Sequence, residues 1–273
     1  MAHSVSPPIE STDRRPAARL SGRDVLNKVP QITLFFWVIK VLCTTVGETA
    51  ADFLIDNLGL GLTVTSIVMA GLLAVALLVQ FRATAYVPSV YWLAVVLISV
   101  VGTLITDNLT DHFEVALEVS TIVFAVALAI TFAAWFASEQ TLSIHTIVTA
   151  KREAFYWLAV LFTFALGTAA GDLVAERYGV GYWQSALLFG AAIAIVTVAH
   201  LVFGLNPVLA FWVAYILTRP LGASLGDYLS QPTDDGGLGL GTVGTSGIFL
   251  AAILGLVVYL TVSRRDRPEP AAA

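Results

Sequence analysis

Residues 155–176 read FYWLAVLFTFALGTAAGDLVAE, and this pattern recurs three more times along the chain. The other copies are FFWVIKVLCTTVGETAADFLID at residues 35–56, VYWLAVVLISVVGTLITDNLTD at residues 90–111 and AFWVAYILTRPLGASLGDYLSQ at residues 210–231. The four copies align without gaps on Trp37, Trp92, Trp157 and Trp212. Counted from each tryptophan, a glycine follows after ten residues, an aspartate after fifteen and, in three copies, a second acid after nineteen. A fourfold match at one spacing indicates an internal repeat, which decides the fold.

The composition indicates that the repeats lie in a membrane. Of the 273 residues, 58% are hydrophobic and only 12% are charged, whereas about 25% are charged in soluble domains. This balance excludes a disordered chain, a nucleic-acid-binding protein and an ordinary soluble enzyme. Apolar runs long enough to cross a hydrocarbon core of about 30 Å predict eight transmembrane helices. We expect them at residues 31–55, 62–82, 87–108, 114–136, 154–175, 182–204, 207–229 and 243–263.

Each repeat contains two predicted helices, so all four copies enter the membrane from the same side. The expected fold is an all-α polytopic membrane protein with four parallel two-helix repeats in two four-helix halves, a pseudo-fourfold arrangement. The predicted segments are a disordered cytoplasmic tail (1–28), repeats 1 and 2 (29–138), a cytoplasmic loop (139–153), repeats 3 and 4 (154–265) and a cytoplasmic tail (266–273). Outside the predicted helices, every basic residue except Arg177 falls on the side of the tails. The positive-inside rule therefore predicts a multi-pass protein of a bacterial inner, or plasma, membrane with both termini cytoplasmic.

These tandem two-helix units, each with its characteristic tryptophan, resemble a bacterial family of multi-spanning membrane proteins whose function is unassigned. The resemblance covers about residues 28–265. It implies the eight-helix architecture and no activity, so functional expectations depend on the residues. The tryptophans themselves are expected near the inner ends of the helices, where an indole anchors at the membrane interface or packs between helices.

Small residues four positions apart in the repeat predict close helix packing. The third and fourth copies have GxxxG motifs, and the first two have weaker versions that end in Ala51 and Thr106. The packing glycines are Gly47, Gly102, Gly167, Gly171, Gly222 and Gly226. Such residues let helix backbones approach closely in lipid. We therefore expect the first helices of the four repeats to surround a central axis.

Each repeated aspartate directly follows a small residue of this motif, so we expect it beside the helix contact and not toward lipid. A charge facing hydrocarbon costs at least about 2.5–3.5 kcal/mol. At about 1.5 Å per residue, the aspartate lies roughly 22 Å beyond its tryptophan, in the outer part of the membrane. The candidate metal ligands are Asp52, Asp107, Asp172, Asp227, Glu48, Asp56, Asp111 and Glu176, and Gln231 replaces the second acid in the last copy. Parallel symmetry predicts a carboxylate ring; the alternative is that these acids only form structural ion pairs.

Two basic residues, Lys40 and Arg219, lie inside the predicted helices and break the fourfold pattern. One interpretation makes them counter-charges, or gating residues, that occupy the acids when no cation is bound. The other makes them fixed salt-bridge partners.

Three classes of function compete. The leading class is a cation transporter or channel, because hard carboxylate oxygens without clustered Cys or His favour Mn²⁺, Ca²⁺ or Mg²⁺, with coupling to protons. The second is a transporter of a small organic or cationic solute, and the third is a non-transporting membrane scaffold or sensor. The sequence has no motif of an enzyme, so we expect neither catalysis nor a cofactor, and a divalent cation enters only as substrate. The expected partners are the lipid bilayer, a metal cation or proton and a second copy in a homo-oligomer, with no nucleic acid.

Overall fold

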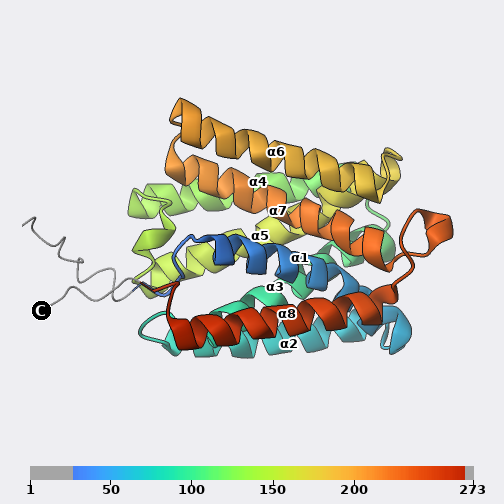
Figure 1. The fold of residues 1–273 in the computed structure, drawn as a ribbon, viewed down its shortest axis with the longest axis horizontal. Coiled ribbons are helices and arrows are strands. Elements are labelled where there is room, and N and C mark those ends of the chain that lie inside the picture. The colour runs from blue at the N-terminus through green and yellow to red at the C-terminus, as the bar shows by residue number, and fades with distance from the viewer. Residues whose placement is uncertain (1–26, 268–273) are drawn as a thin grey trace, which may run out of the picture.

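The computed structural model describes residues 27–267, which form eight α-helices and no β-strand (Figure 1). All eight helices in this range are long and apolar enough to cross a membrane. They are α1 (Leu34–Asp52), α2 (Gly61–Arg82), α3 (Pro88–Asp107), α4 (Leu117–Glu139), α5 (Ala150–Asp172), α6 (Tyr182–Phe203), α7 (Pro207–Ser230) and α8 (Gly241–Ser263). The predicted all-helical fold with eight spanning helices is confirmed.

The helix ends differ most from the predicted segments in two places. First, α4 and α5 both extend into the expected 139–153 loop, so the connection shortens to residues 140–149. Thr149 caps α5 by accepting a hydrogen bond from the Arg152 amide at 3.3 Å, and this cap adds polar residues that hydropathy assigns to a loop. Second, α1, α3 and α5 each continue into a five-residue π-helical turn directly after the repeated aspartate. The turns are η2 (Phe53–Asn57), η3 (Asn108–His112) and η5 (Leu173–Arg177).

The odd-numbered helices form an inner ring and the even-numbered helices form an outer layer. In the most apolar stretch of each helix, 56–67% of the residues are buried in the odd helices, against 11–28% in the even helices. Around the ring, α1 packs on α3, α3 on α5, α5 on α7 and α7 on α1. Each even helix packs on the first helix of the next repeat, and α8 returns to α1. The repeats therefore close into a pseudo-fourfold bundle whose two halves share one core.

The glycine ten residues after each tryptophan lies against the next helix of the ring. A methyl group added there would overlap the side chain seven residues after the tryptophan of the next repeat. The pairs around the ring are Gly47–Ser99, Gly102–Phe164, Gly167–Arg219 and Gly222–Thr44. The later glycines are less tightly covered, since an added Cβ would lie 3.5 Å from Pro220 Cα at Gly171 and 3.3 Å from the Thr45 carbonyl at Gly226. The first glycine of each repeat thus sets how closely neighbouring helices approach.

The two ends of the described chain, around Lys28 and Asp266, bind to the bundle near the first residues of the odd-numbered helices. The Lys28 ammonium lies 2.7 Å from the buried Glu153 carboxylate. The Tyr86 hydroxyl donates to the Asp266 carboxylate at 2.6 Å, and burial raises the pKa of both groups. Lys28 and Asp266, the residues at the inner edges of the two predicted tails, therefore bind partners within the bundle. Residues 1–26 and 268–273 of the predicted tails lie outside the described part of the chain.

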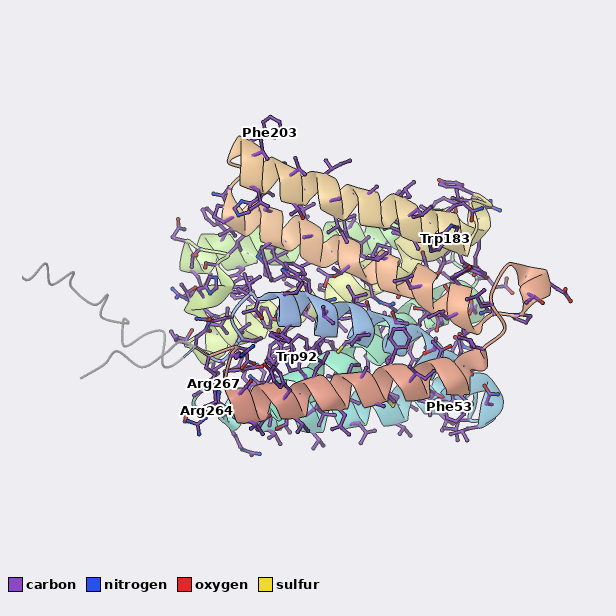
Figure 2. The ribbon with its side chains drawn as sticks, viewed as in Figure 1. Phe53, Trp92, Trp183, Phe203, Arg264 and Arg267 are labelled. Atoms are coloured by element: carbon purple, nitrogen blue, oxygen red, sulfur yellow. The ribbon has the colours of Figure 1, made fainter. Side chains whose placement is uncertain are left out.

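The two ends of the bundle differ in charge. Figure 2 shows Arg264 and Arg267 at the same end as Phe203, with Phe53 and Trp183 at the other end. The described basic residues near the first end are Lys28, Arg82, Lys151, Arg152, Arg264, Arg265 and Arg267. We call this the basic end. The opposite end, where the odd helices finish at the repeated aspartates, is the acidic end.

Three of the four repeat tryptophans are buried in the protein core. Trp92, Trp157 and Trp212 are only 2–4% exposed, and Trp37 is half-buried. Each of them contacts an aromatic side chain of the preceding repeat, in the pairs Phe36–Trp92, Tyr91–Trp157 and Tyr156–Trp212. The Tyr91 and Tyr156 hydroxyls also meet there, at 2.5 Å. The packing interpretation of the tryptophans therefore holds for three of the four repeats.

Candidate cation site in the helix ring

Arg219 is the fully buried centre of the ring. It lies on α7 directly before Pro220, seven residues after Trp212, and its side chain is 0% exposed. The guanidinium lies 2.8 Å from the Glu48 carboxylate and donates a hydrogen bond of 3.1 Å to the Thr44 carbonyl; both partners are on α1. It also donates to the Thr103 hydroxyl on α3 and, at 2.7 Å, to the Thr168 hydroxyl on α5. One cation thus contacts all three other helices of the ring.

The three side chains that hold Arg219 occupy the same position in their repeats. Each follows its tryptophan by eleven residues, directly after the packing glycine. In order along the chain they are Glu48, Thr103 and Thr168, and the fourth repeat has Ala223 at this position. Because equivalent positions of a parallel ring converge on the axis, the guanidinium sits at the centre of the pseudo-fourfold arrangement. A carboxylate, two hydroxyls and a carbonyl form a cage of hard oxygens around a positive charge.

The four repeated aspartates surround the axis one helical turn beyond the side chains that hold the Arg219 guanidinium, toward the acidic end. Each interacts electrostatically with the aspartates of both neighbouring repeats. The interacting pairs are Asp52–Asp107, Asp107–Asp172, Asp172–Asp227 and Asp227–Asp52. Glu48 interacts with three of them, namely Asp107, Asp172 and Asp227. The structure therefore brings together the carboxylates that the repeat pattern selected, with Glu48 between their ring and Arg219.

The second acids of the repeats lie farther out, in the π-helical turns. Asp111 and Glu176 are exposed, and the Glu176 carboxylate accepts a hydrogen bond from the Tyr182 hydroxyl at 3.2 Å. Asp56 belongs to η2, but its side chain lies outside what the structure describes. A π-helical turn widens the helix, so the second acid no longer stacks directly on the first. Asp111 and Glu176 thus form an outer rim at the acidic end, and they interact electrostatically with the aspartate ring beneath them.

The described side chains do not form a ready-made metal site. Within residues 27–267, no group of three or more His, Cys, Asp and Glu side chains is arranged to hold a metal ion. The aspartates are close enough to interact through their charges, but no three of them form such a group. Direct coordination of a divalent cation would require these carboxylates to move together.

Lys40 differs from the expected counter-charge. It is 1% exposed on α1, and its ammonium lies 4.0 Å from the ring centroid of Phe164 and 4.3 Å from that of Tyr215. Among the described residues its nitrogen finds neither a hydrogen-bond partner nor an acid. Lys40 therefore occupies an aromatic cage on the basic side of Arg219. Of these two basic residues, only Arg219 pairs with a carboxylate, that of Glu48.

Sequence reasoning missed the threonines of the cage. Thr103 and Thr168 are ordinary polar residues in apolar helices, and neither belongs to the tryptophan–glycine–aspartate pattern. The signal was nevertheless present, because the position directly after the packing glycine is polar in three of the four copies. The oxygen cage could have been found by comparing the repeats at that position.

Comparisons with known proteins agree with the repeat. A model of the Repeat of Unknown Function (DUF347) matches residues 35–86, 90–141, 155–205 and 210–266, one match for each pair of helices. Neither the curated proteins nor the solved structures contain a match to the chain.

Proposed function

This chain belongs to the family of the Repeat of Unknown Function (DUF347), and from the geometry of its four repeats we propose that it is a cation transporter or channel of a bacterial inner membrane. The observation that carries the proposal is the Arg219 guanidinium, a tethered cation held on the axis by oxygen atoms from the three other repeats. A site that holds one positive charge in this way has the chemistry to hold another.

The proposed path runs from the acidic rim through the aspartate ring to the Glu48–Arg219 pair. Buried carboxylates in a membrane are expensive and mark ion pathways. Four neighbouring aspartates repel one another if all are ionised, so bound protons or a cation must offset their charge. A cation that enters the ring would displace protons and weaken the attraction between Glu48 and Arg219. Arg219 would then act as the internal counter-charge that fills the site when no cation is bound.

A hard divalent cation, Mn²⁺, Ca²⁺ or Mg²⁺, is the substrate that we propose first. Carboxylate, hydroxyl and carbonyl oxygens are the ligands these ions prefer. Because no described group is arranged to hold a metal in this state, the proposal requires Arg219 to withdraw from Glu48 before the aspartates close around the ion. Exchange of the ion for protons would couple its movement to the proton gradient.

A second candidate substrate is a small organic cation, and one observation favours it. The Lys40 ammonium rests between the Phe164 and Tyr215 rings at 4.0 and 4.3 Å, the arrangement in which proteins recognise ammonium groups. The helix bundle therefore already holds two tethered organic cations, Lys40 and Arg219. A non-transporting scaffold or sensor is the third class, and in that class the same contacts are purely structural.

Uptake into reconstituted vesicles tests the proposal. Asp172→Asn keeps the size of the side chain and removes one charge of the ring, so uptake of Mn²⁺, Ca²⁺ or Mg²⁺ should fall and its pH dependence should change. The matched control is Asp234→Asn, which removes an exposed acid at the same end and outside the ring, and should leave uptake unchanged. Uptake of an organic ammonium or guanidinium compound in place of the metals would select the second candidate. No uptake of either kind by the unmodified protein would refute transport.

A further inference from the structure

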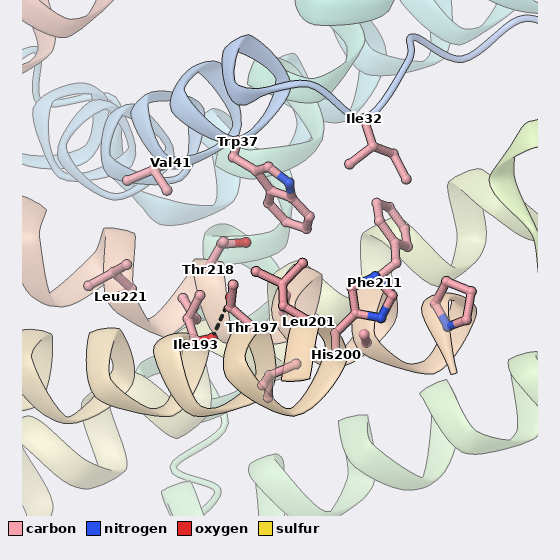
Figure 3. Close-up of a pocket in the computed structure, with 14 residues that line it drawn as sticks. Ile32, Trp37, Val41, Ile193, Thr197, His200, Leu201, Phe211, Thr218 and Leu221 are labelled. Carbon is pink, nitrogen blue, oxygen red and sulfur yellow. Dashed lines mark hydrogen bonds between the residues drawn. The ribbon is translucent and has the colours of Figure 1, made fainter. Parts of the chain in front are cut away.

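A lateral groove between α1, α6 and α7 interrupts the fourfold packing of the bundle. Its volume is about 510 Å³. Figure 3 shows Trp37 on one wall and Thr197 and His200 on the other, with Phe211 and Thr218 of α7 also lining the groove. Because α6 is an outer helix, the groove opens on the surface that the spanning helices present to lipid.

Equivalent residues of the preceding repeat explain why the groove exists. The second and third repeats are offset by 65 residues, so Thr197 and His200 correspond to Phe132 and Trp135. Those two aromatic side chains pack on Trp212, with ring centroids 4.8 and 5.9 Å apart. Trp37 is the counterpart of Trp212 in the first repeat, but it faces the smaller side chains of Thr197 and His200.

A third substitution enlarges the same space. Phe155 of the third repeat stacks on Trp135 of the second repeat, with their centroids 6.3 Å apart. The residue that corresponds to Phe155 in the fourth repeat is Ala210, and Ala210 lines the groove. Three bulky aromatic residues that pack between the second and third repeats therefore have smaller counterparts between the third and fourth repeats. Trp135 is fully buried, whereas His200 is only half-buried. The groove is thus a local departure from a packing scheme that the same chain fills elsewhere.

The lining determines the chemistry of the occupant. The Thr197 hydroxyl donates to the Ile193 carbonyl at 2.8 Å, and the Thr218 hydroxyl donates to the Tyr215 carbonyl at 2.7 Å. One nitrogen of the His200 ring lies 2.8 Å from the Leu205 carbonyl. Both hydroxyl protons and one His200 nitrogen are therefore engaged within the protein, and the rest of the lining is mainly aliphatic and aromatic. A polar ligand would lose its hydration without replacement partners, whereas a hydrocarbon chain would not.

The dimensions also suit a hydrocarbon chain. Along α7 the groove extends from Pro207 to Leu221, which at about 1.5 Å per residue is roughly 21 Å. It runs along the helix axis and therefore parallel to the lipid chains of the bilayer, over more than half of a hydrocarbon core of about 30 Å. The α6 surface at its opening is apolar, since Leu201 lines the groove and is 75% exposed.

We propose that this groove binds one acyl chain of a membrane phospholipid, which replaces the aromatic side chains missing from this repeat interface. The polar sequence at residues 1–26 does not match such a lining, and neither does a soluble metabolite. The bound chain would pack against Trp37 and keep α1 seated on α7. This inference does not depend on the proposed transport function.

The test combines photocrosslinking with groove-filling variants of the full chain. The protein is placed in vesicles of phosphatidylethanolamine and phosphatidylglycerol that contain a phospholipid with a diazirine near the end of one acyl chain. Crosslinks should concentrate on groove residues such as Ile193 and Val41. The double variant Thr197→Phe/His200→Trp restores the side chains of the preceding repeat and should abolish these crosslinks. Ile195→Phe, on the outward face of α6, is the matched control and should keep them.

Thermal unfolding gives a second measurement. Removing lipid with detergent should lower the melting temperature of the unmodified protein more than that of Thr197→Phe/His200→Trp, whose groove is already filled. Crosslinks spread evenly over the outer helices would overturn the proposal, and so would protein–protein crosslinks through the groove, which would indicate a second copy as the occupant. If the double variant does not fold, the distribution of crosslinks on the unmodified protein alone decides.

Discussion

Replacing Gly222 by alanine should disrupt the closure of the helix ring between α7 and α1. The added Cβ would overlap the Thr44 side chain and lie 3.1 Å from the Thr44 carbonyl carbon, so a side-chain rotation alone does not relieve the overlap and α1 must shift. The Thr44 hydroxyl also donates to the Val41 and Thr218 carbonyls at 2.6 and 3.2 Å, and the overlap disturbs both bonds. Gly222→Ala therefore tests whether close helix contact holds the first and last repeats together.

The free energy of unfolding should fall by about 2–3 kcal/mol. Overpacking costs about 1–3 kcal/mol and the upper end applies because backbone must move, while a disturbed hydrogen bond adds about 1 kcal/mol. Against this, alanine is better than glycine in a helix by up to about 1 kcal/mol. At about 2–4 °C per kcal/mol for a chain of this size, the melting temperature should drop by roughly 4–12 °C.

Thermal unfolding of the purified full chain, followed by tryptophan fluorescence, measures this effect. Gly171→Ala is the matched control within the ring, because its added Cβ would meet Pro220 Cα at 3.5 Å, an ordinary contact. Gly190→Ala on the outer helix α6 has nothing within 4 Å and reports helix propensity alone. Both should melt at or above the temperature of the unmodified protein. Adding Thr44→Ala to Gly222→Ala should recover part of the loss. If Gly222→Ala melted as high as Gly171→Ala, close packing of the ring would not be what stabilises the bundle.

Three further changes test other parts of the structure by the same measurement. Lys28→Met leaves the buried Glu153 carboxylate without its cation and should lower the free energy of unfolding by about 3–5 kcal/mol. The double variant Lys28→Met/Glu153→Gln should recover most of this loss. Equal losses in the two variants would contradict the pairing of Lys28 with Glu153. Lys40→Met removes a buried nitrogen with no hydrogen-bond partner among the described residues and should leave stability unchanged or raised by about 1–3 kcal/mol; a clear loss would show that the aromatic cage stabilises the ammonium. Because burial raises the pKa of Asp266, the stability that its protonated form contributes is present below the usual aspartate pKa of about 4 and is lost as pH rises through the higher folded value. At acidic pH, Asp266→Asn should therefore be less stable than the unmodified protein. This difference in stability should become smaller as the pH rises toward neutral. A difference that does not change with pH would refute the raised pKa of Asp266.

The repeat pattern predicts the helices well because hydropathy and spacing are local properties. All eight helices overlap their predicted spans, and the largest departures occur at polar helix ends such as Thr149. The π-helical turns were not predicted, since five-residue turns after the aspartates leave no distinct mark in hydropathy. The repeat pattern also did not predict the order of the helices around the ring, because that order depends on which helix surfaces fit together in three dimensions.

The candidate site was predicted in part. Glycines and aspartates at constant spacing pointed to the ring, and the structure brings the four aspartates into mutual interaction. The partners of Arg219 lie 51 to 175 residues away along the chain, so no local pattern connects them. Lys40 and Arg219 looked alike as lone basic residues in apolar helices. Only the surrounding side chains separate them: a carboxylate faces Arg219, whereas two aromatic rings face Lys40.

The differences among the repeats explain why this architecture needs one chain with four unlike copies. Strict fourfold symmetry would place four identical side chains at each level of the axis. Four copies of Glu48 or four copies of Arg219 would repel one another in a medium of low dielectric constant, and four threonines would provide no charge to hold an ion. Instead, one arginine, one glutamate and two threonines meet there and satisfy most of one another's hydrogen bonds. Repetition therefore supplies the ring, while divergence at its centre supplies the charge pair. The same reasoning applies at the outer layer, where Thr197, His200 and Ala210 open a groove that an identical repeat would have closed.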